Sequence, residues 1–321
     1  MVHSLAIAGI IVARQVLGQY LLKFPVKLKE IKLVLSMPKL LKAKDIIDAE
    51  LPRLTQKCHE LEQRGLKPNL NVVLVGDNPA SHSYVKNKKR MCEKIGAQFV
   101  LHHLASDIPE TEFLNLLGKI NNDKAVTGCF VQLPIPKHLQ HLDVTQMINP
   151  TKDVDGFHLN TVCDLYLGNL DKVIPCTPKG IITMLRKNNI QIEGADIVII
   201  GRSHIVGKPL SLILEGLNAT VTLCHSRTKD LKKHTRSADI VISAVGRAEF
   251  LNADYLKDGS TVIDVGINKT DKGLVGDVDF ASATEKAIAI TPVPGGVGPM
   301  TVFSLMENLL MTTETILKER S

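Results

Sequence analysis

At residues 195–214 the sequence reads ADIVIIGRSHIVGKPLSLIL. The mostly β-branched run 195–200 predicts a buried strand, and the apolar run 210–214 predicts the start of a helix. Residues 201–209 then form the kind of βα turn that can hold a phosphate group. The two glycines are spaced G-x-x-x-x-x-G instead of G-x-G-x-x-G, so the turn alone does not separate a cofactor site from a plain connection.

Strands and helices alternate on both sides of this turn. Pro52 lies inside the first predicted helix and should kink or split it. A proline-containing connection between about 134 and 178 separates two runs of alternation, which predicts an α/β fold of two units with parallel sheets, the second Rossmann-like. The predicted helices are 43–63, 80–95, 110–121, 179–188 and 300–317, and the predicted strands are 70–75, 97–101, 126–133, 195–200, 220–224, 239–244, 261–265 and 287–290.

Composition and charge exclude some classes of protein. The chain has 321 residues, of which 44% are hydrophobic and 22% charged, as in globular proteins with room for two domains. Of the formal net charge of +6, residues 1–36 carry +4, which leaves +2 for the remaining 285 residues. We therefore expect no nucleic-acid partner.

The six cysteines are scattered without a C-x-x-C pair, and no histidine stands at a zinc-ligand spacing from them. In a chain of this length, that pattern favours buried thiols in a reducing compartment over disulfides. We expect no metal site from it.

The first 36 residues differ from the rest of the chain. Their apolar run, 5–22, is interrupted by Arg14, Gln15 and Gln19, so we expect no membrane span. It also lacks the basic segment and the cleavage site of a secretory signal. Two interpretations of residues 1–36 remain. They are an organelle-targeting segment or an extension upstream of a working start at Met37. We favour the extension and a cytoplasmic protein, with a mitochondrial location as the alternative.

The end of the second strand in the Rossmann-like unit carries no acidic side chain. In dinucleotide folds an acid at this place binds the 2′-hydroxyl of the NAD ribose. Here His225, Ser226, Arg227 and Thr228 follow the strand. Ser226 and Arg202 are candidate ligands for a 2′-phosphate, whereas a solvated surface role explains Arg227 equally well. The sequence therefore favours NADP over NAD.

Three features of the first unit are candidates for binding or converting a substrate, and so is one loop near the C-terminal end of the chain. Tyr84 and Lys88 are four residues apart, on one face of a predicted helix. A Tyr-x-x-x-Lys pair also serves short-chain dehydrogenases, but there it follows the cofactor turn, and here it precedes that turn by more than a hundred residues. Gln132 ends a buried strand and needs a polar partner. Asp155 lies in the glycine-containing turn 152–157, and the loop 291–301 is dense in glycine and proline.

These motifs together resemble the bifunctional methylenetetrahydrofolate dehydrogenase/cyclohydrolase family of the bacterial FolD type. The resemblance covers about residues 38–317, and TPVPGGVGPMT and DVDGF are its most specific parts. The matching stretches are VGDNPASHSYVKNKKR (75–90), VQLPIP (131–136), PTKDVDGF (150–157), PCTPKG (175–180), GRSHIVGKP (201–209), CHSRT (224–228), VIDVGIN (262–268), GDVDF (276–280) and TPVPGGVGPMT (291–301).

The resemblance implies NADP-dependent oxidation of 5,10-methylenetetrahydrofolate, followed by hydrolysis to 10-formyltetrahydrofolate. Its catalytic lysine falls on Lys88, its stacking tyrosine on Tyr84, the glutamine that tunes the lysine on Gln132 and the pterin-binding aspartate on Asp155. By the same resemblance the substrate site adds Val131, Leu133, Pro294, Gly295 and Gly296, and the cofactor site comprises Gly201, Arg202, Ser203, Ser226 and Ile267.

The resemblance also implies a division of the chain and a homodimer. A catalytic domain is expected at 37–178, with the C-terminal helix 300–321 packing back on it, and an NAD(P)-binding domain at 179–299, with the active site in the cleft between them. A dehydrogenase-only folate enzyme and a different NAD(P)-dependent dehydrogenase remain as alternatives. A non-enzymatic NADP sensor would have no use for Lys88, Gln132 and Asp155 together.

Overall fold

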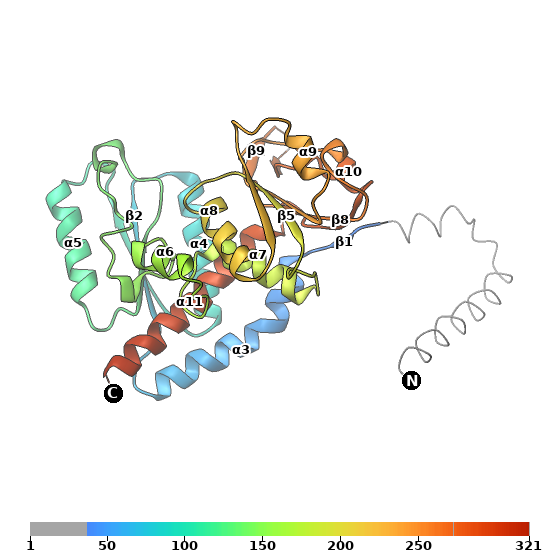
Figure 1. The fold of residues 1–321 in the computed structure, drawn as a ribbon. Helices are drawn as coiled ribbons and strands as arrows, with labels where there is room; N and C mark the ends of the chain where they lie inside the picture. The colour runs from blue at the N-terminus through green and yellow to red at the C-terminus, as the bar shows by residue number, and fades with distance from the viewer. Residues whose placement is uncertain (1–36, 272, 321) are drawn as a thin grey trace, which may run out of the picture. The chain divides into compact units, whose positions relative to one another are not determined.

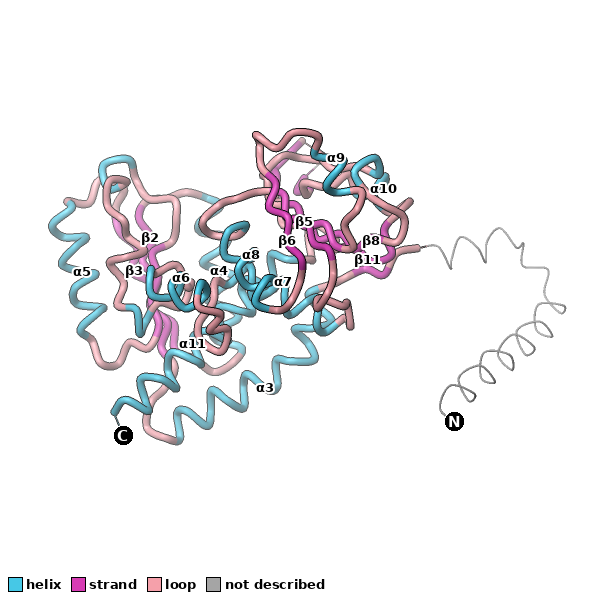
Figure 2. Tube along the Cα trace, in the orientation of Figure 1, coloured by secondary structure: helices cyan, strands magenta, loops and turns pink. Residues whose placement is uncertain are grey.

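Two parallel sheets organise the chain, as the alternating pattern predicts. The structure is a computed structural model that describes residues 37–271 and 273–320. The expectations for residues 1–36 lie outside this description. Residues Leu40–Ser321 form one compact unit, and Figure 2 shows its longer strands gathered in two groups.

The first sheet has the strand order β3-β2-β4, and all its strands are parallel. All seven residues of β2 are buried, because helices cover both faces of the sheet. Val72 belongs to the cluster that includes residues of α3 and α4, whereas Val73 faces α5 on the other side. These elements are α3 (Ala43–Gln63), β2 (Asn69–Val75), α4 (Pro79–Lys94), β3 (Gln98–Leu104), α5 (Glu110–Asn122) and β4 (Gly128–Val131).

The second sheet runs in the order β11-β8-β7-β5-β6, again with all these strands parallel. Leu40 of the two-residue strand β1 (Lys39–Leu40) lies on the outer side of β11. The strand order changes direction between β5 and β7, which is where open α/β sheets bind ligands. The remaining elements of this half are β5 (Asp196–Ile200), α8 (Gly207–Gly216), β6 (Thr220–Cys224), α9 (Leu231–Thr235), β7 (Ile240–Ser243), η3 (Ala253–Tyr255), β8 (Ser260–Asp264), α10 (Phe280–Ala283) and β11 (Ala287–Ile290).

The last helix, α11 (Val297–Arg320), packs against α3 and α7 (Cys176–Lys187). Figure 1 shows this red helix running alongside the blue α3. One continuous hydrophobic cluster includes residues from α3, β2, α7, β5 and α11, so it extends from one sheet to the other. The connection between the sheets also contains η1 (Lys137–Leu139), η2 (Pro150–Lys152) and α6 (Leu159–Tyr166).

Three details differ from the sequence prediction. Pro52 was expected to kink or split helix α3; the helix is one element, so the split is wrong. Proline has no amide hydrogen, so the Asp48 carbonyl lacks the partner that residue 52 would otherwise supply. Asp48 and Pro52 are both exposed, so water can bind this carbonyl. Helix α7 begins at Cys176 rather than at residue 179. An antiparallel pair of short strands, β9 (Asn268–Thr270) and β10 (Gly273–Val275), was not predicted, since three-residue strands give no alternation to detect.

The cysteines follow the predicted pattern with one exception. All six are free, and all are buried except Cys163 on α6. Burial raises the pKa of the thiols, to about 11 for Cys58 and about 12 for Cys92 and Cys129. Over the residues that the structure describes, no helix is both long enough and apolar enough to cross a bilayer.

A fully buried amide, Asn308, joins α11 to the connection between the sheets. Its Nδ2 donates to the carbonyl oxygens of Val154 at 2.8 Å and Ile174 at 2.9 Å. Its Oδ1 accepts from Lys179 Nζ at 2.8 Å. Desolvation lowers the pKa of Lys179, so this ammonium depends on the few polar partners it has.

Replacing Asn308 with leucine should destabilise the protein strongly. The variant leaves two buried carbonyls and the Lys179 ammonium without this partner, and each loss costs about 1–3 kcal/mol. We expect the free energy of unfolding, measured by denaturant titration, to fall by about 3 kcal/mol or more. The control Asn115→Leu, at an exposed site on α5, should change it by less than about 0.5 kcal/mol. Equal effects of the two substitutions would contradict this role.

Candidate active site

Helix α4 presents Tyr84 and Lys88 on one face. The helix begins after Asn78, whose side chain accepts hydrogen bonds from the amides of Ala80 and Ser81, and Pro79 occupies its first turn. Tyr84 is 39% exposed, whereas Lys88 is only 8% exposed. The helix therefore offers an accessible aromatic ring one turn before a buried amine.

Lys88 contacts the end of β4. Its Nζ donates to Gln132 Oε1 at 3.2 Å and lies 3.7 Å from the centroid of the Phe130 ring. Gln132 Nε2 donates to the carbonyl of Leu133 at 2.8 Å, which turns Oε1 toward the lysine. The expected polar partner of Gln132 is thus Lys88, which gives this amine one oriented acceptor beside an aromatic face.

Asp155 lies in a turn that a second aspartate builds. Asp153 Oδ1 accepts from the amides of Asp155 at 3.1 Å and Gly156 at 3.0 Å, and Oδ2 accepts from His158 at 2.8 Å. A Cβ on Gly156 would lie 2.8 Å from the Ile174 carbonyl carbon, so only glycine fits there. Desolvation raises the pKa of Asp155, and the nearby Lys88 charge acts in the opposite direction. Within the described ranges, no hydrogen bond occupies the Asp155 carboxylate.

Several predicted substrate residues line one small cavity. Val131, Leu133 and Asp155 are among its walls, together with Phe130 and Phe157. Leu133 is 42% exposed, which is high for a leucine beside a buried strand. Tyr84 does not line this cavity, but it lies one helical turn before Lys88, whose Nζ contacts the Phe130 ring in the cavity wall.

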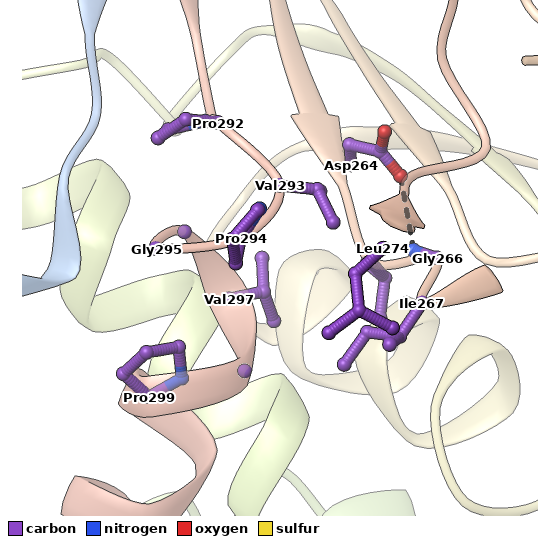
Figure 3. Close-up of a pocket in the computed structure, with 13 residues that line it drawn as sticks. Asp264, Gly266, Ile267, Leu274, Pro292, Val293, Pro294, Gly295, Val297 and Pro299 are labelled. Atoms are coloured by element: carbon purple, nitrogen blue, oxygen red, sulfur yellow. Dashed lines mark hydrogen bonds between the residues drawn. The ribbon is translucent and has the colours of Figure 1, made fainter. Parts of the chain in front are cut away.

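A second pocket lies under the glycine- and proline-rich loop between β11 and α11. It is lined by residues 292–299 of that loop and by Asp264, Gly266, Ile267 and Leu274. Figure 3 shows the Ile267 and Leu274 side chains lying across from Pro294 and Val297. The predicted substrate residues Pro294, Gly295 and Gly296 and the predicted cofactor residue Ile267 therefore share one pocket.

The turn after β5 is tightly constrained. Gly201 has φ +120°, and a Cβ there would lie 2.2 Å from the carbonyl oxygen of Ala244 at the end of β7. A Cβ on Gly207 would lie 1.9 Å from the Gly201 carbonyl oxygen. Neither position has room for a side chain, so both glycines are required for the turn that leads from β5, past the end of β7, into α8. Ser203 Oγ accepts from the Val206 amide at 3.2 Å, so this predicted cofactor residue closes the turn on itself.

A third pocket opens where β5, β6 and β7 end. Among its walls are the predicted residues Gly201, Arg202 and Ser226. Arg247 also lines it, and sequence reasoning missed this residue. Arg247 follows shortly after the predicted strand 239–244, at the carboxyl edge where open α/β sheets bind ligands, and that position is the signal by which it could have been found. Arg227 is not among the lining residues.

Two buried aspartates hold the loops around these pockets. Asp277 accepts hydrogen bonds from the amides of Val245, Gly246 and Arg247 at 2.7–3.2 Å. Asp264 accepts from the amides of Gly266, Asp277 and Val278, each at 2.9 Å. Burial raises the pKa of Asp264 to about 6 despite these donors. The loops that bear Arg247 and Ile267 are therefore fixed by one connected carboxylate network.

The chain matches two family models. The tetrahydrofolate dehydrogenase/cyclohydrolase catalytic domain matches residues 41–155, and the NAD(P)-binding domain of the same family matches residues 175–317. The bifunctional protein FolD of Bacillus subtilis is 48% identical over 266 residues, which cover 83% of this chain and 94% of that protein. FolD of Oceanobacillus iheyensis is 50% identical over 275 residues, 85% of this chain and 96% of its own length.

Solved structures of similar proteins share the fold. The bifunctional FolD enzyme of Campylobacter jejuni superposes with a TM-score of 0.83 at 43% identity, covering 86% of this chain and 99% of that chain. The Trypanosoma brucei methylenetetrahydrofolate dehydrogenase-cyclohydrolase, solved with NADP and an inhibitor, gives a TM-score of 0.83 at 31% identity, with 89% and 99% covered.

The raised pKa of Asp264 predicts a pH dependence of stability. A carboxyl with a pKa of about 6 in the folded protein and an ordinary pKa of 3.8 in the unfolded chain binds its proton more tightly in the folded protein. Its stabilising contribution is therefore full below about pH 4 and is lost as pH rises through about 6. Carbon NMR titration of the Asp264 carboxyl should give a pKa about two units above the ordinary value. A midpoint near 4 would refute this.

Proposed function

Because the chain belongs to the tetrahydrofolate dehydrogenase/cyclohydrolase family, we propose that it oxidises 5,10-methylenetetrahydrofolate with NADP and hydrolyses the methenyl product to 10-formyltetrahydrofolate. The observation that carries this proposal is the contact of Lys88 with Gln132, close enough to Asp155 for their charges to interact. A buried amine and a carboxyl free to bind substrate, beside a hydrophobic cavity, suit a flat polar heterocycle.

Lys88 is the proposed proton carrier of the hydrolytic step. Loss of a hydride from the one-carbon bridge leaves a cation on the folate, which water then attacks. In its neutral form Lys88 can take a proton from that water, and Gln132 Oε1 holds the amine in place by accepting from Nζ at 3.2 Å. Its low exposure of 8% keeps bulk water from competing at this point.

Asp155 and Tyr84 are the proposed binding groups for the folate rings. The carboxylate of Asp155 can accept hydrogen bonds from the amino and ring N–H groups of the pterin. The exposed ring of Tyr84 and the exposed side chain of Leu133 offer apolar surface for stacking, while Val131 closes the cavity behind them. Pro294, Gly295 and Gly296 are proposed to border the substrate from the other pocket.

The pocket at the ends of β5, β6 and β7 fits NADP. Gly201 and Gly207 let the turn pack tightly against the carbonyl oxygens of Ala244 and Gly201, and a tight glycine turn between a strand and a helix is where backbone amides can bind a pyrophosphate. Arg202, Arg247 and Ser226 offer two guanidinium groups and a hydroxyl to a 2′-phosphate, and no acidic residue lines this pocket. Ser203 and Ile267 complete the proposed cofactor residues. The bound cofactor supplies the hydride acceptor.

The proposal extends to domains, location and assembly. We place the catalytic domain at 37–178, joined by the C-terminal helix 300–321, the NAD(P)-binding domain at 179–299, and the active site in the cleft between them. The contact of α11 with α3 supports joining the C-terminal helix to the catalytic domain, whereas its contact with α7, most of which follows residue 178, also ties it to the second domain. A homodimer in the cytoplasm is proposed from the family resemblance, and size-exclusion chromatography with light scattering tests the dimer.

An absorbance assay tests the function as a whole. Methylenetetrahydrofolate is added with NADP or with NAD, and the methenyl product is followed as it forms and then hydrolyses. Turnover with NADP and enzyme-dependent decay of the methenyl signal are expected. Absence of turnover with either cofactor refutes the proposal, and accumulation of the methenyl product identifies a dehydrogenase-only enzyme.

A Lys88→Met variant should lose the hydrolytic step. Removing a positioned acid–base group lowers a rate by about 10²–10⁴-fold, so methenyl hydrolysis should fall within this range while NADP affinity is retained. Lys89→Met is the matched control, because Lys89 is exposed on the same helix and faces Glu93 at 3.8 Å. Unchanged hydrolysis in Lys88→Met would exclude the assigned role.

An Arg202→Ala variant should weaken NADP binding selectively. Losing a charge-assisted contact to the 2′-phosphate costs about 1.5–3 kcal/mol, a rise in Kd of about tenfold to a hundredfold. The Kd for NAD, which lacks that phosphate, should change little. Arg227→Ala serves as the control from outside the pocket lining. Parallel losses of NAD and NADP binding would argue against 2′-phosphate recognition by Arg202.

A further inference from the structure

Three metal-ligating side chains meet outside the proposed active site. Asp77, His82 and His103 come from the turn after β2, from α4 and from β3, and their ligand atoms all lie within 4.8 Å of one another. Over the residues that the structure describes, this is the one group of three or more His, Cys, Asp or Glu side chains arranged in this way. Nothing in the proposed reaction uses it.

The distances match those between ligands of a tetrahedral metal ion. Asp77 Oδ1 lies 3.4 Å from His82 Nε2 and 3.2 Å from His103 Nε2. Ligands placed ~2.0–2.1 Å from a tetrahedral Zn²⁺ are separated by ~3.3–3.4 Å. The two imidazole rings stand edge to face with centroids 5.1 Å apart, and a ligand nitrogen of each lies within 4.8 Å of the other and of the carboxylate oxygen.

The backbone fixes the three positions independently of any ion pair. Parallel pairing places His103 beside Leu74 of β2, and the Gly76 amide donates to Leu104 at 2.9 Å. The His82 amide donates to the Asn78 carbonyl at 3.1 Å, in the first turn of α4. The side chains themselves are 42–81% exposed, and ion pairs this exposed contribute little. The fold therefore places the three residues next to one another, and attraction among their exposed side chains adds little.

We propose that Asp77, His82 and His103 form a surface site for a divalent transition-metal ion of the Zn²⁺ type. Two imidazoles and one carboxylate suit Zn²⁺, Cu²⁺ or Ni²⁺, whereas Mg²⁺ and Ca²⁺ require oxygen ligands. Without an ion, His103 Nε2 can donate a hydrogen bond to the Gly76 carbonyl oxygen at 3.2 Å, so metal binding requires the tautomer with its proton on Nδ1. The exposure of the site leaves room for water as a further ligand. The sequence prediction of no metal site missed this group, because sheet pairing and not sequence spacing brings its members together.

Calorimetric titration of the chelator-treated full chain with ZnCl₂ tests the site. The wild-type protein should show a tight class of about one Zn²⁺ per chain. His82→Ala, His103→Ala and Asp77→Asn should each weaken this class by at least about tenfold, since even the loss of an outer-shell partner costs about 10–100-fold in metal affinity. MgCl₂ should neither bind at this site nor compete with Zn²⁺.

The matched control is His141→Ala. His141 Nε2 lies 3.1 Å from Glu110 Oε2, so it is a surface histidine–carboxylate pair without a third ligand. It should keep the wild-type Zn²⁺ affinity, and the melting temperatures of all the variants should confirm that they fold. Absence of the tight class in the wild type, or its survival in both folded His82→Ala and His103→Ala, overturns the proposal. Neither result bears on folate turnover.

Discussion

The buried side chain of Asn308 is the contact on which the arrangement of the two halves depends. From the middle of α11 it binds the carbonyl of Val154, one residue before Asp155, and the carbonyl of Ile174, just before α7 leads to the second sheet. It also accepts from Lys179 on α7. One amide thus joins the C-terminal helix, the turn that bears the proposed pterin ligand and the route into the cofactor-binding half.

The proposed functional residues of this protein lie where parallel strands end. Gln132 follows β4, the Gly201 turn follows β5, Arg247 follows β7 and Ile267 follows β8. In each case a buried strand delivers its next residues to the carboxyl edge of a sheet. Gln132 is held there by its hydrogen bond to the Leu133 carbonyl, the Gly201 turn by its close approach to Ala244, and the loops of Arg247 and Ile267 by the buried aspartates. The two sheets use the same arrangement for different proposed tasks, a proton carrier at one sheet and phosphate ligands at the other.

Much of this could be predicted from the sequence, and the failures have physical causes. Long buried strands such as β5 and amphipathic helices such as α4 reveal themselves through periodicity, and Lys88, Gln132 and Asp155 were noticeable as polar residues at strand ends or on a helix face. Pro52 does not split α3, because the carbonyl left without an amide partner belongs to the exposed Asp48, and only the fold reveals this exposure. Asn308 and Asp277 act through contacts with residues distant in sequence, which no local pattern encodes.

The continuous hydrophobic cluster has a consequence for dissecting the chain. The family models divide the sequence near residues 155–175, yet α11, which follows the second sheet, buries Phe303, Leu309 and Leu310 in the same cluster as Leu70 and Val72 of the first sheet. A fragment that stops before α11 would expose this apolar surface to water. We therefore expect residues Leu40–Ser321 to unfold cooperatively as one unit. The two domains of the family models are not expected to fold independently of each other.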